Sequence, residues 1–225
     1  MRIEHPHRLL PFLCLPALLL ALASPAAAQS GSDRDFSDRT LTVGVGVGGY
    51  VPSLFTELRP HALVELDVGF MLPFMQRKLA VVAQLAYAPP GNDGTGSDAR
   101  LGETGAYSFD ITTHQLMVGL GPVFRLAPPG SSFVPYAGLL GRIYMLRTLS
   151  NGAADPGEPS QAPFGENTEE SLEFGAALLL GGELRLGPGS LSLELSFGYS
   201  TLPHQITGDV STSSIGGALG YRLFL

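Results

Sequence analysis

The chain has 225 residues, with 20 acidic against 13 basic side chains, a formal net charge of −7 and one cysteine. This acidic balance argues against a nucleic-acid partner or a polybasic surface role. With 29 glycines and 18 prolines but 44% hydrophobic residues, the composition also excludes a disordered or collagen-like chain.

Residues 1–28 have the pattern of a secretory signal peptide. Arg2 and Arg8 precede an apolar run over residues 9–23, and Ala26–Ala28 form a small-residue cleavage site before Gln29. The run contains two prolines and is short for a membrane-spanning helix, which needs about 20 residues. We therefore expect cleavage near Ala28, and then a flexible periplasmic segment over residues 29–40. The exported chain would contain no cysteine and hence no disulfide.

From residue 41 onward, apolar and polar side chains alternate with the period of two that predicts β-strands. The first predicted strand, residues 41–51, places Leu41, Val43, Val45 and Val47 on one face and mainly glycines on the other. The same pattern predicts seven further strands, over residues 62–71, 78–88, 107–126, 133–147, 172–186, 191–202 and 215–225. The strand over 107–126 has no clear facing, because Pro122 shares the face of Leu116 and Leu120.

The predicted connections alternate in length. Short turns over residues 72–77, 127–132 and 187–189 alternate with longer loops over 52–60, 89–105, 148–171 and 203–210. This alternation is typical of barrels with short periplasmic turns and long extracellular loops. An even number of strands returns both ends of the barrel to the same side.

The last eleven residues, IGGALGYRLFL, resemble the closing strand of outer-membrane β-barrels. That strand has an aromatic residue five from the end and an apolar last residue, and the barrel-insertion machinery reads it in that family. The matching face here consists of Leu219, Tyr221, Leu223 and Leu225. Phe is the usual last residue in the family, whereas here Phe224 lies one place early and on the other face.

The chain over residues 41–225 then resembles the small outer-membrane proteins of the OmpA, OmpX and OmpW type. The resemblance implies an all-β, eight-stranded antiparallel up-and-down transmembrane β-barrel without an appended periplasmic domain. It also implies a monomer in the outer membrane, in contact with outer-membrane lipid and lipopolysaccharide. No cofactor is expected.

Alternation alone does not say which face of the barrel is inside. A soluble lipocalin-like carrier would bury the apolar face around a ligand. The apolar faces here are continuous, whereas the opposite faces are rich in glycine and serine, and the chain has one lysine, Lys78. A water-facing surface usually carries more charge than 15% overall, which favours an outward apolar face.

Charged residues on the polar faces predict an interior network, because charges inside a narrow barrel must be paired. The candidate residues are Glu65, Asp67, Arg142, Glu173, Glu183, Arg185, Glu194 and Arg222. The network predicts a side-chain-filled interior and a non-enzymatic envelope or surface role. A narrow channel or small-solute barrel is the alternative, because inward glycines could leave a wet gap: Gly44, Gly46, Gly48, Gly181, Gly198, Gly216 and Gly220.

A rim enzyme that modifies lipid A is a third hypothesis. His114 shares a strand face with Asp110 and Ser108, and a second candidate set combines His204, Asp209 and Ser211. Neither set matches a motif of such enzymes, so we expect no catalytic residues.

Two acidic stretches are candidate metal sites. Residues 92–98 have calcium-loop composition without the bidentate glutamate that such loops need. The loop over 148–171 contains acids that could meet divalent cations bridging lipopolysaccharide: Asp155, Glu158, Glu166, Glu169 and Glu170. We expect solvated loop charge in both stretches, and no metal site.

Overall fold

In a computed structural model, the structure describes residues 39–52, 58–97, 105–128, 131–154, 167–203, 206 and 210–225. The predicted signal peptide and nearly all of the segment that follows it lie outside these residues. All described residues belong to the unit Asp35–Leu225.

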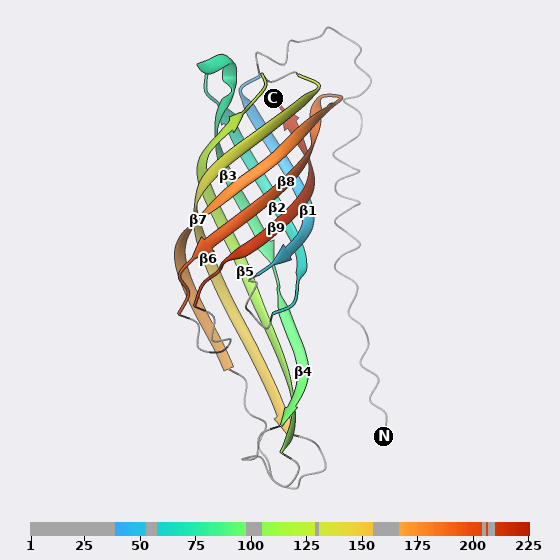
Figure 1. Ribbon diagram of the computed structural model, residues 1–225, viewed down its shortest axis with the longest axis vertical. Helices are drawn as coiled ribbons and strands as arrows, with labels where there is room; N and C mark the ends of the chain where they lie inside the picture. Colours follow the sequence, from blue (N-terminus) through green and yellow to red (C-terminus); the bar gives the residue numbers. More distant parts are fainter. Residues whose placement is uncertain are drawn as a thin grey trace. The chain divides into compact units, whose positions relative to one another are not determined.

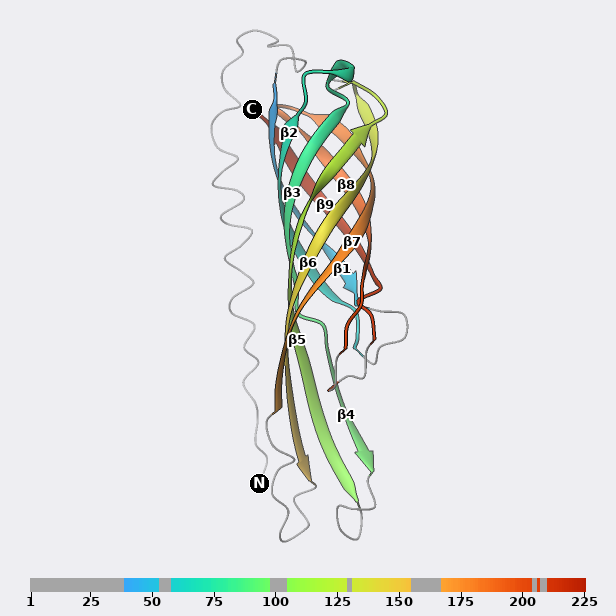
Figure 2. The ribbon, with the colours of Figure 1, turned by 90° about the vertical axis from the view of Figure 1, so that its left-hand side faces the viewer.

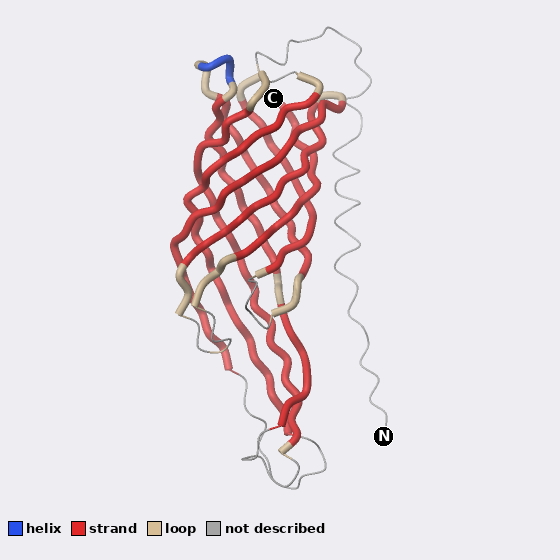
Figure 3. The backbone as a smooth tube through the Cα atoms, in the orientation of Figure 1, coloured by secondary structure: helices blue, strands red, loops and turns tan. Residues whose placement is uncertain are grey.

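The described chain consists almost entirely of strands (Figure 3). They are β1 (Leu41–Val51), β2 (His61–Met71), β3 (Leu79–Ala88), β4 (Gly91–Ser97), β5 (Ala106–Arg125), β6 (Phe133–Ala154), β7 (Asn167–Leu186), β8 (Gly189–Ser200) and β9 (Ser214–Phe224). One short 3₁₀ turn, η3 (Met75–Arg77), connects β2 to β3 with positive φ angles of 54–57°. No helix in the described part of the chain is long and apolar enough to span a membrane.

Eight of these strands close into an antiparallel up-and-down barrel (Figure 1). The order around the barrel is β1, β2, β3, β5, β6, β7, β8 and β9, and β9 pairs back to β1. Thr42 lies opposite Phe224 in that closing pair, so the barrel begins and ends at the same rim. We call this rim the terminus end and the opposite rim the loop end. The predicted eight-stranded barrel is confirmed.

The prediction of a loop over residues 89–105 is wrong for residues 91–97. They form β4, which pairs with the N-terminal part of β5 from Gly91↔Thr112 to Ser97↔Ala106. β6 and β7 are also longer than predicted, reaching Ala154 and starting at Asn167. Together β4 and the outer parts of β5, β6 and β7 form an extension that continues past the loop end of the barrel (Figure 2). Backbone pairing with β5 stabilises β4 although its sequence, GNDGTGS, lacks apolar alternation.

The side chains of the barrel strands alternate strictly between an outward apolar face and an inward buried face. Phe174 is 70% exposed and Leu193 is 60% exposed on the outward face, whereas Leu140 and Tyr144 on β6 are fully buried inside. The undecided strand, β5, follows the same rule: Leu120 faces outward and Met117 inward. The apolar face therefore points away from the barrel interior, opposite to a lipocalin-like carrier.

Candidate functional site

The barrel interior places a band of charged residues between two apolar clusters. Along β2, the inward residues from the terminus end are Met71, then Asp67 and Glu65, then Leu63. β9 repeats this order with Phe224, Arg222 and Ala218. We call the charged band the interior ion cluster; it contains Glu65, Asp67, Arg125, Arg142, Glu183, Glu194 and Arg222, with Gln84 and Tyr136 as neutral members.

Arg222 is the centre of the interior ion cluster. Its Nε and Nη2 donate to the two carboxylate oxygens of Asp67 at 2.9 and 3.1 Å, which is a bidentate pair. Its Nη1 donates to Glu183 Oε1, and its Nη2 lies 3.9 Å from Glu194 Oε2. The guanidinium carbon also lies 5.5 Å from the centre of the Tyr136 ring. One arginine thus connects strands β2, β6, β7, β8 and β9 across the interior.

Arg125 provides the second cation at the terminus end. Its Nη2 donates to Glu183 Oε1 at 3.1 Å and its Nε to Oε2 at 3.4 Å. Both side chains are almost fully buried, with exposed fractions of 1% and 2%. Glu183 therefore accepts from two guanidinium groups, which compensates its burial.

Gln84 links Arg142 to the carboxylates of the interior ion cluster. Its amide nitrogen donates to Glu194 Oε1 at 3.0 Å and lies 3.5 Å from Glu65 Oε2. Its amide oxygen accepts from Arg142 Nη2 at 2.6 Å. Tyr136 adds a hydroxyl that donates to Glu194 Oε2 at 2.7 Å. A neutral amide therefore separates Arg142 from the carboxylates of Glu65 and Glu194.

Six of the eight residues predicted for the interior network lie in this cluster: Glu65, Asp67, Arg142, Glu183, Glu194 and Arg222. Glu173 and Arg185 do not join it. Glu173 is only half-buried, opposite Tyr144 nearer the loop end, and Arg185 is exposed two residues before the turn at Gly187. Alternation places both on the inward face, but a side chain near a rim reaches solvent.

Sequence reasoning missed Arg125, Gln84 and Tyr136 as cluster members. Gln84 and Tyr136 carry no charge, so a search for paired charges on the polar faces does not select them. Arg125 was missed because Pro122 left the facing of its strand undecided. The alternation of Met117 and Val123 with the outward row of Leu120 and Phe124 is the signal that would have placed it inward.

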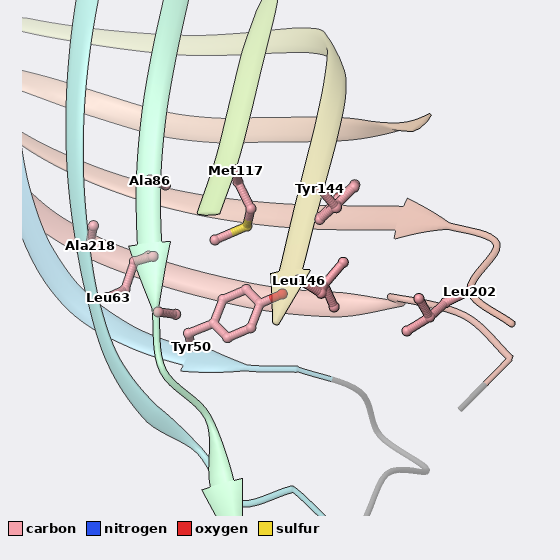
Figure 4. Packing of buried hydrophobic residues seen from close by; sticks show 9 residues of the cluster. Tyr50, Leu63, Ala86, Met117, Tyr144, Leu146, Leu202 and Ala218 are labelled. Carbon is pink, nitrogen blue, oxygen red and sulfur yellow. The ribbon is translucent and has the colours of Figure 1, made fainter. Parts of the chain in front are cut away.

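Apolar side chains fill the interior on both sides of the charged band. Figure 4 shows the cluster nearer the loop end, where the Tyr50 ring projects among Leu63, Met117, Tyr144 and Leu146. The cluster nearer the terminus end consists of Met71, Ala80, Val82, Val123, Tyr136, Leu140, Leu179 and Phe224. The inward side chains of the described strands thus pack across the interior at three levels.

The inward glycines make room for larger side chains on neighbouring strands. A methyl group added at Gly46 would lie 2.7 Å from Glu65 Oε1, and one at Gly44 would overlap the Asp67 carboxylate. The Tyr136 ring lies against Gly181 in the same way. Side chains also lie close to Gly198, Gly216 and Gly220, whereas Gly48 lies against the β9 backbone and is exposed. Apart from Gly48, these inward glycines therefore lie against neighbouring side chains.

The first candidate set for a rim enzyme is spread along β5. His114 Nδ1 is hydrogen-bonded to the Tyr87 hydroxyl at 2.7 Å. Asp110 and Ser108 lie farther along the outward row of β5, and a rise of about 3.3 Å per residue separates them from His114. His204 and Asp209 lie outside the described residues, and Ser211 bonds the Ser213 hydroxyl at 2.9 Å.

The two acidic stretches show no metal site among the described residues. Residues 92–97 are part of β4, where successive side chains point to opposite faces and cannot surround one cation. In the second stretch, Glu169 and Glu170 lie on β7, whereas Asp155, Glu158 and Glu166 fall outside the described residues.

The C-terminal strand presents the face that the sequence singled out. Leu219, Leu223 and Leu225 are exposed at 52%, 37% and 61% on the outside of the barrel, and Tyr221 bonds the Leu186 carbonyl at 2.8 Å. Phe224 points inward into the cluster at the terminus end.

Comparison with known proteins finds likeness in structure only. No family model and no curated protein sequence matches the chain. The N-terminal β-barrel domain of Pseudomonas aeruginosa OprF is similar with a TM-score of 0.48 and 10% identity, over 83% of this chain and 98% of that chain. The outer membrane protein OprG from the same organism gives 0.45 and 13%, over 83% and 98%. Ail, the attachment invasion locus protein of Yersinia pestis, gives 0.42 and 15%, over 82% and 97%.

Proposed function

We propose that this chain is an integral outer-membrane β-barrel that serves the envelope or the cell surface without catalysis and without conducting ions. The outward apolar face supports the membrane location, because it covers all eight barrel strands and would be unstable in water. Strands of 10 to 12 residues, such as β3 and β8, also match the about 9–11 tilted residues that cross a bilayer.

The observation that carries the non-conducting role is the packing of the interior. Arg222, Asp67 and Glu183 bind one another across the barrel, and apolar side chains lie on both sides of them. An eight-stranded barrel is just wide enough for such side chains to fill it. A hydrated ion would have to break charge-assisted hydrogen bonds to pass.

Conductance in planar bilayers tests this function. A heat-modifiability gel first identifies folded chain, which should migrate differently before and after boiling in detergent. Folded wild-type chain should then give no steady single-channel steps. Regular steps whose amplitude changes in the Arg222→Met variant would contradict the closed interior and favour the narrow channel.

The outward face of β9 is proposed as the signal that the barrel-insertion machinery recognises. Substituting Leu223 and Leu225 together with serine should slow assembly while leaving the interior contacts intact. Substituting Ser211 and Ser213 with alanine, just before the N-terminal end of β9, is the control. If the Leu223/Leu225 variant and wild type assemble at equal rates in vesicles without the insertion machinery, but the variant is slower when the machinery is present, the effect lies in recognition.

The absence of catalysis is tested on the membrane itself. Mass analysis of lipid A from cells that express the folded chain should match that from cells without it. A mass change that disappears in the His114→Gln variant would support the rim-enzyme hypothesis instead.

A further inference from the structure

A row of polar side chains lies on the outside of the barrel where the apolar surface ends. His114 on β5 pairs in register with Arg147 on β6, and Arg147 pairs with Glu170 on β7. The next row toward the terminus end is apolar, with Leu116, Met145 and Leu172. The polar row therefore marks an abrupt change of surroundings on this side of the molecule.

Arg147 stands apart from the other arginines of the strands. Arg125, Arg142, Arg185 and Arg222 occupy inward positions, whereas Arg147 occupies an outward one and is 61% exposed. Among the described residues its charged partner is Glu170, whose Oε1 lies 3.6 Å from Nε. That contact leaves the two terminal nitrogens, the edge that binds phosphate in a bidentate manner, without a partner in the described chain.

His114 is oriented by its neighbour. The Tyr87 hydroxyl lies 2.7 Å from Nδ1, and the two rings stack at 6.3 Å with an interplanar angle of 16°. A hydroxyl that donates to Nδ1 leaves the hydrogen on Nε2, which then points a donor away from Tyr87. Directly opposed positions in an antiparallel pair lie about 4.5–5.5 Å apart, so one ligand can reach both His114 and Arg147.

We propose that His114 and Arg147 form a binding site for a phosphate group of lipid A, the lipid part of lipopolysaccharide. The proposal rests on the proposed membrane location, because the site faces lipid only if the apolar band crosses the membrane. Loops and the extension leave the barrel at this rim, as expected for the outer leaflet. Lipid A presents its phosphates at the boundary between acyl chains and water, which is the level of this row. Glu170 acts as a positioning residue that holds Arg147 through Nε.

Native mass spectrometry of the detergent-solubilised full chain tests the site with three lipids: bisphosphorylated lipid A, the same lipid A after enzymatic dephosphorylation, and phosphatidylglycerol. Wild type should bind bisphosphorylated lipid A about tenfold more tightly than dephosphorylated lipid A, because a charge-assisted contact is lost. The double variant H114Q/R147Q should bind both forms equally. The matched control, Arg185→Gln, removes an exposed arginine near the other rim and should bind as wild type does.

Several results would overturn the site. The first is that H114Q/R147Q binds bisphosphorylated lipid A as tightly as wild type does. The second is that Arg185→Gln loses the preference for the phosphorylated form. The third is that wild type binds phosphatidylglycerol as tightly as it binds lipid A. A heat-modifiability gel on each sample separates this failure from failure of the proposed function. If wild type and all variants shift on heating and enter vesicles, but wild type does not prefer phosphorylated lipid A, only the lipid site is wrong. If wild type neither shifts nor enters vesicles, the membrane location is wrong and the lipid site with it.

Discussion

The barrel and its extension share strands β5, β6 and β7, yet the outward row of β5 is apolar in the barrel and polar in the extension. On the barrel part of β5, Leu120 faces outward at 61% exposure and Gln115 is buried inside. In the extension, Asp110 lies on that outward row, while Phe109 and Tyr107 lie on the inward row. The strand keeps its period of two throughout, so this change along the outward row reflects the surroundings. It indicates lipid around the barrel and water around the extension.

The two regions also differ in how far their ion pairs are exposed to solvent. Inside the barrel, Arg222 is 6% exposed and meets three carboxylates. At the extension, Arg59 from the connection between β1 and β2 forms an ion pair with Asp93 of β4 at 3.3 Å, in which the side chains are 63% and 74% exposed. Buried and exposed ion pairs differ greatly in what their loss costs, because only the buried one leaves a desolvated partner. This contrast predicts a graded series of mutational effects.

The largest effect should follow from removing the central cation. Arg222→Met leaves the buried carboxylate of Asp67 without its partner and that of Glu183 with Arg125 alone, which should lower the free energy of unfolding by about 3–5 kcal/mol. Urea titration of the barrel in vesicles measures this change. The double variant R222M/D67L removes the stranded charge as well, while Glu183 keeps its pair with Arg125, and should recover much of the loss. Equal destabilisation of the two variants would mean that lost packing, and not stranded charge, dominates.

The second effect separates the two environments on one strand. Leu139→Arg places a charge on the outward face of the barrel part of β6, which should cost about 2–4 kcal/mol if that position lies near the middle of the membrane. Asn151→Arg makes the matched change on the outward row in the extension and should stay within about 0.5 kcal/mol. Unfolding in vesicles followed by gel shift measures both. Similar costs at the two positions would contradict the boundary that the change along the outward row of β5 indicates.

The third effect should be local to the extension. The Phe109 ring covers Gly94 on β4, with a methyl group added at that glycine lying 3.0 Å from the ring. Phe109→Ala removes this cover and should destabilise the β4–β5 pair by about 0.5–1.5 kcal/mol. Hydrogen exchange should increase at the β4 amides while the barrel amides keep their protection. Increased exchange across the whole barrel would show that the extension and the barrel unfold as one unit.

Alternation predicted the barrel from sequence because a membrane-facing strand must be apolar on one side. The predicted bounds of the first strand coincide with β1, and the shared face predicted for Leu41, Val43 and Val47 is the outward face of that strand. The same rule could not predict β4, since glycine, asparagine and aspartate ordinarily signal a turn. There the partner strand supplies both the backbone pairing and the aromatic cover.

The interior ion cluster was predictable in part. Charges such as Asp67 and Arg222 lie opposite an apolar row in the sequence, so their inward facing follows directly. Which of them meet depends on the stagger between strands, which alternation does not encode. Asp67 and Arg222 contact each other because both lie opposite Gly44, on its two sides. Arg185 also lies on the inward face but beside a turn. The period of two does not tell how far from the rim of the barrel a side chain lies.

The smallest effect should come from the exposed ion pair of the extension. Arg59 donates to the Asp93 side chain at 3.3 Å and to the Asp93 carbonyl at 3.0 Å, and it bridges to Gly91 through its backbone. Arg59→Gln should change the free energy of unfolding by no more than about 1 kcal/mol, because both partners stay hydrated. High salt should weaken the wild-type pair and shrink the difference further. If Arg59→Gln instead lowered the free energy of unfolding in vesicles as much as Arg222→Met does, the extension would not be in water. The contrast between buried charge in the barrel and hydrated charge at the extension would then be wrong.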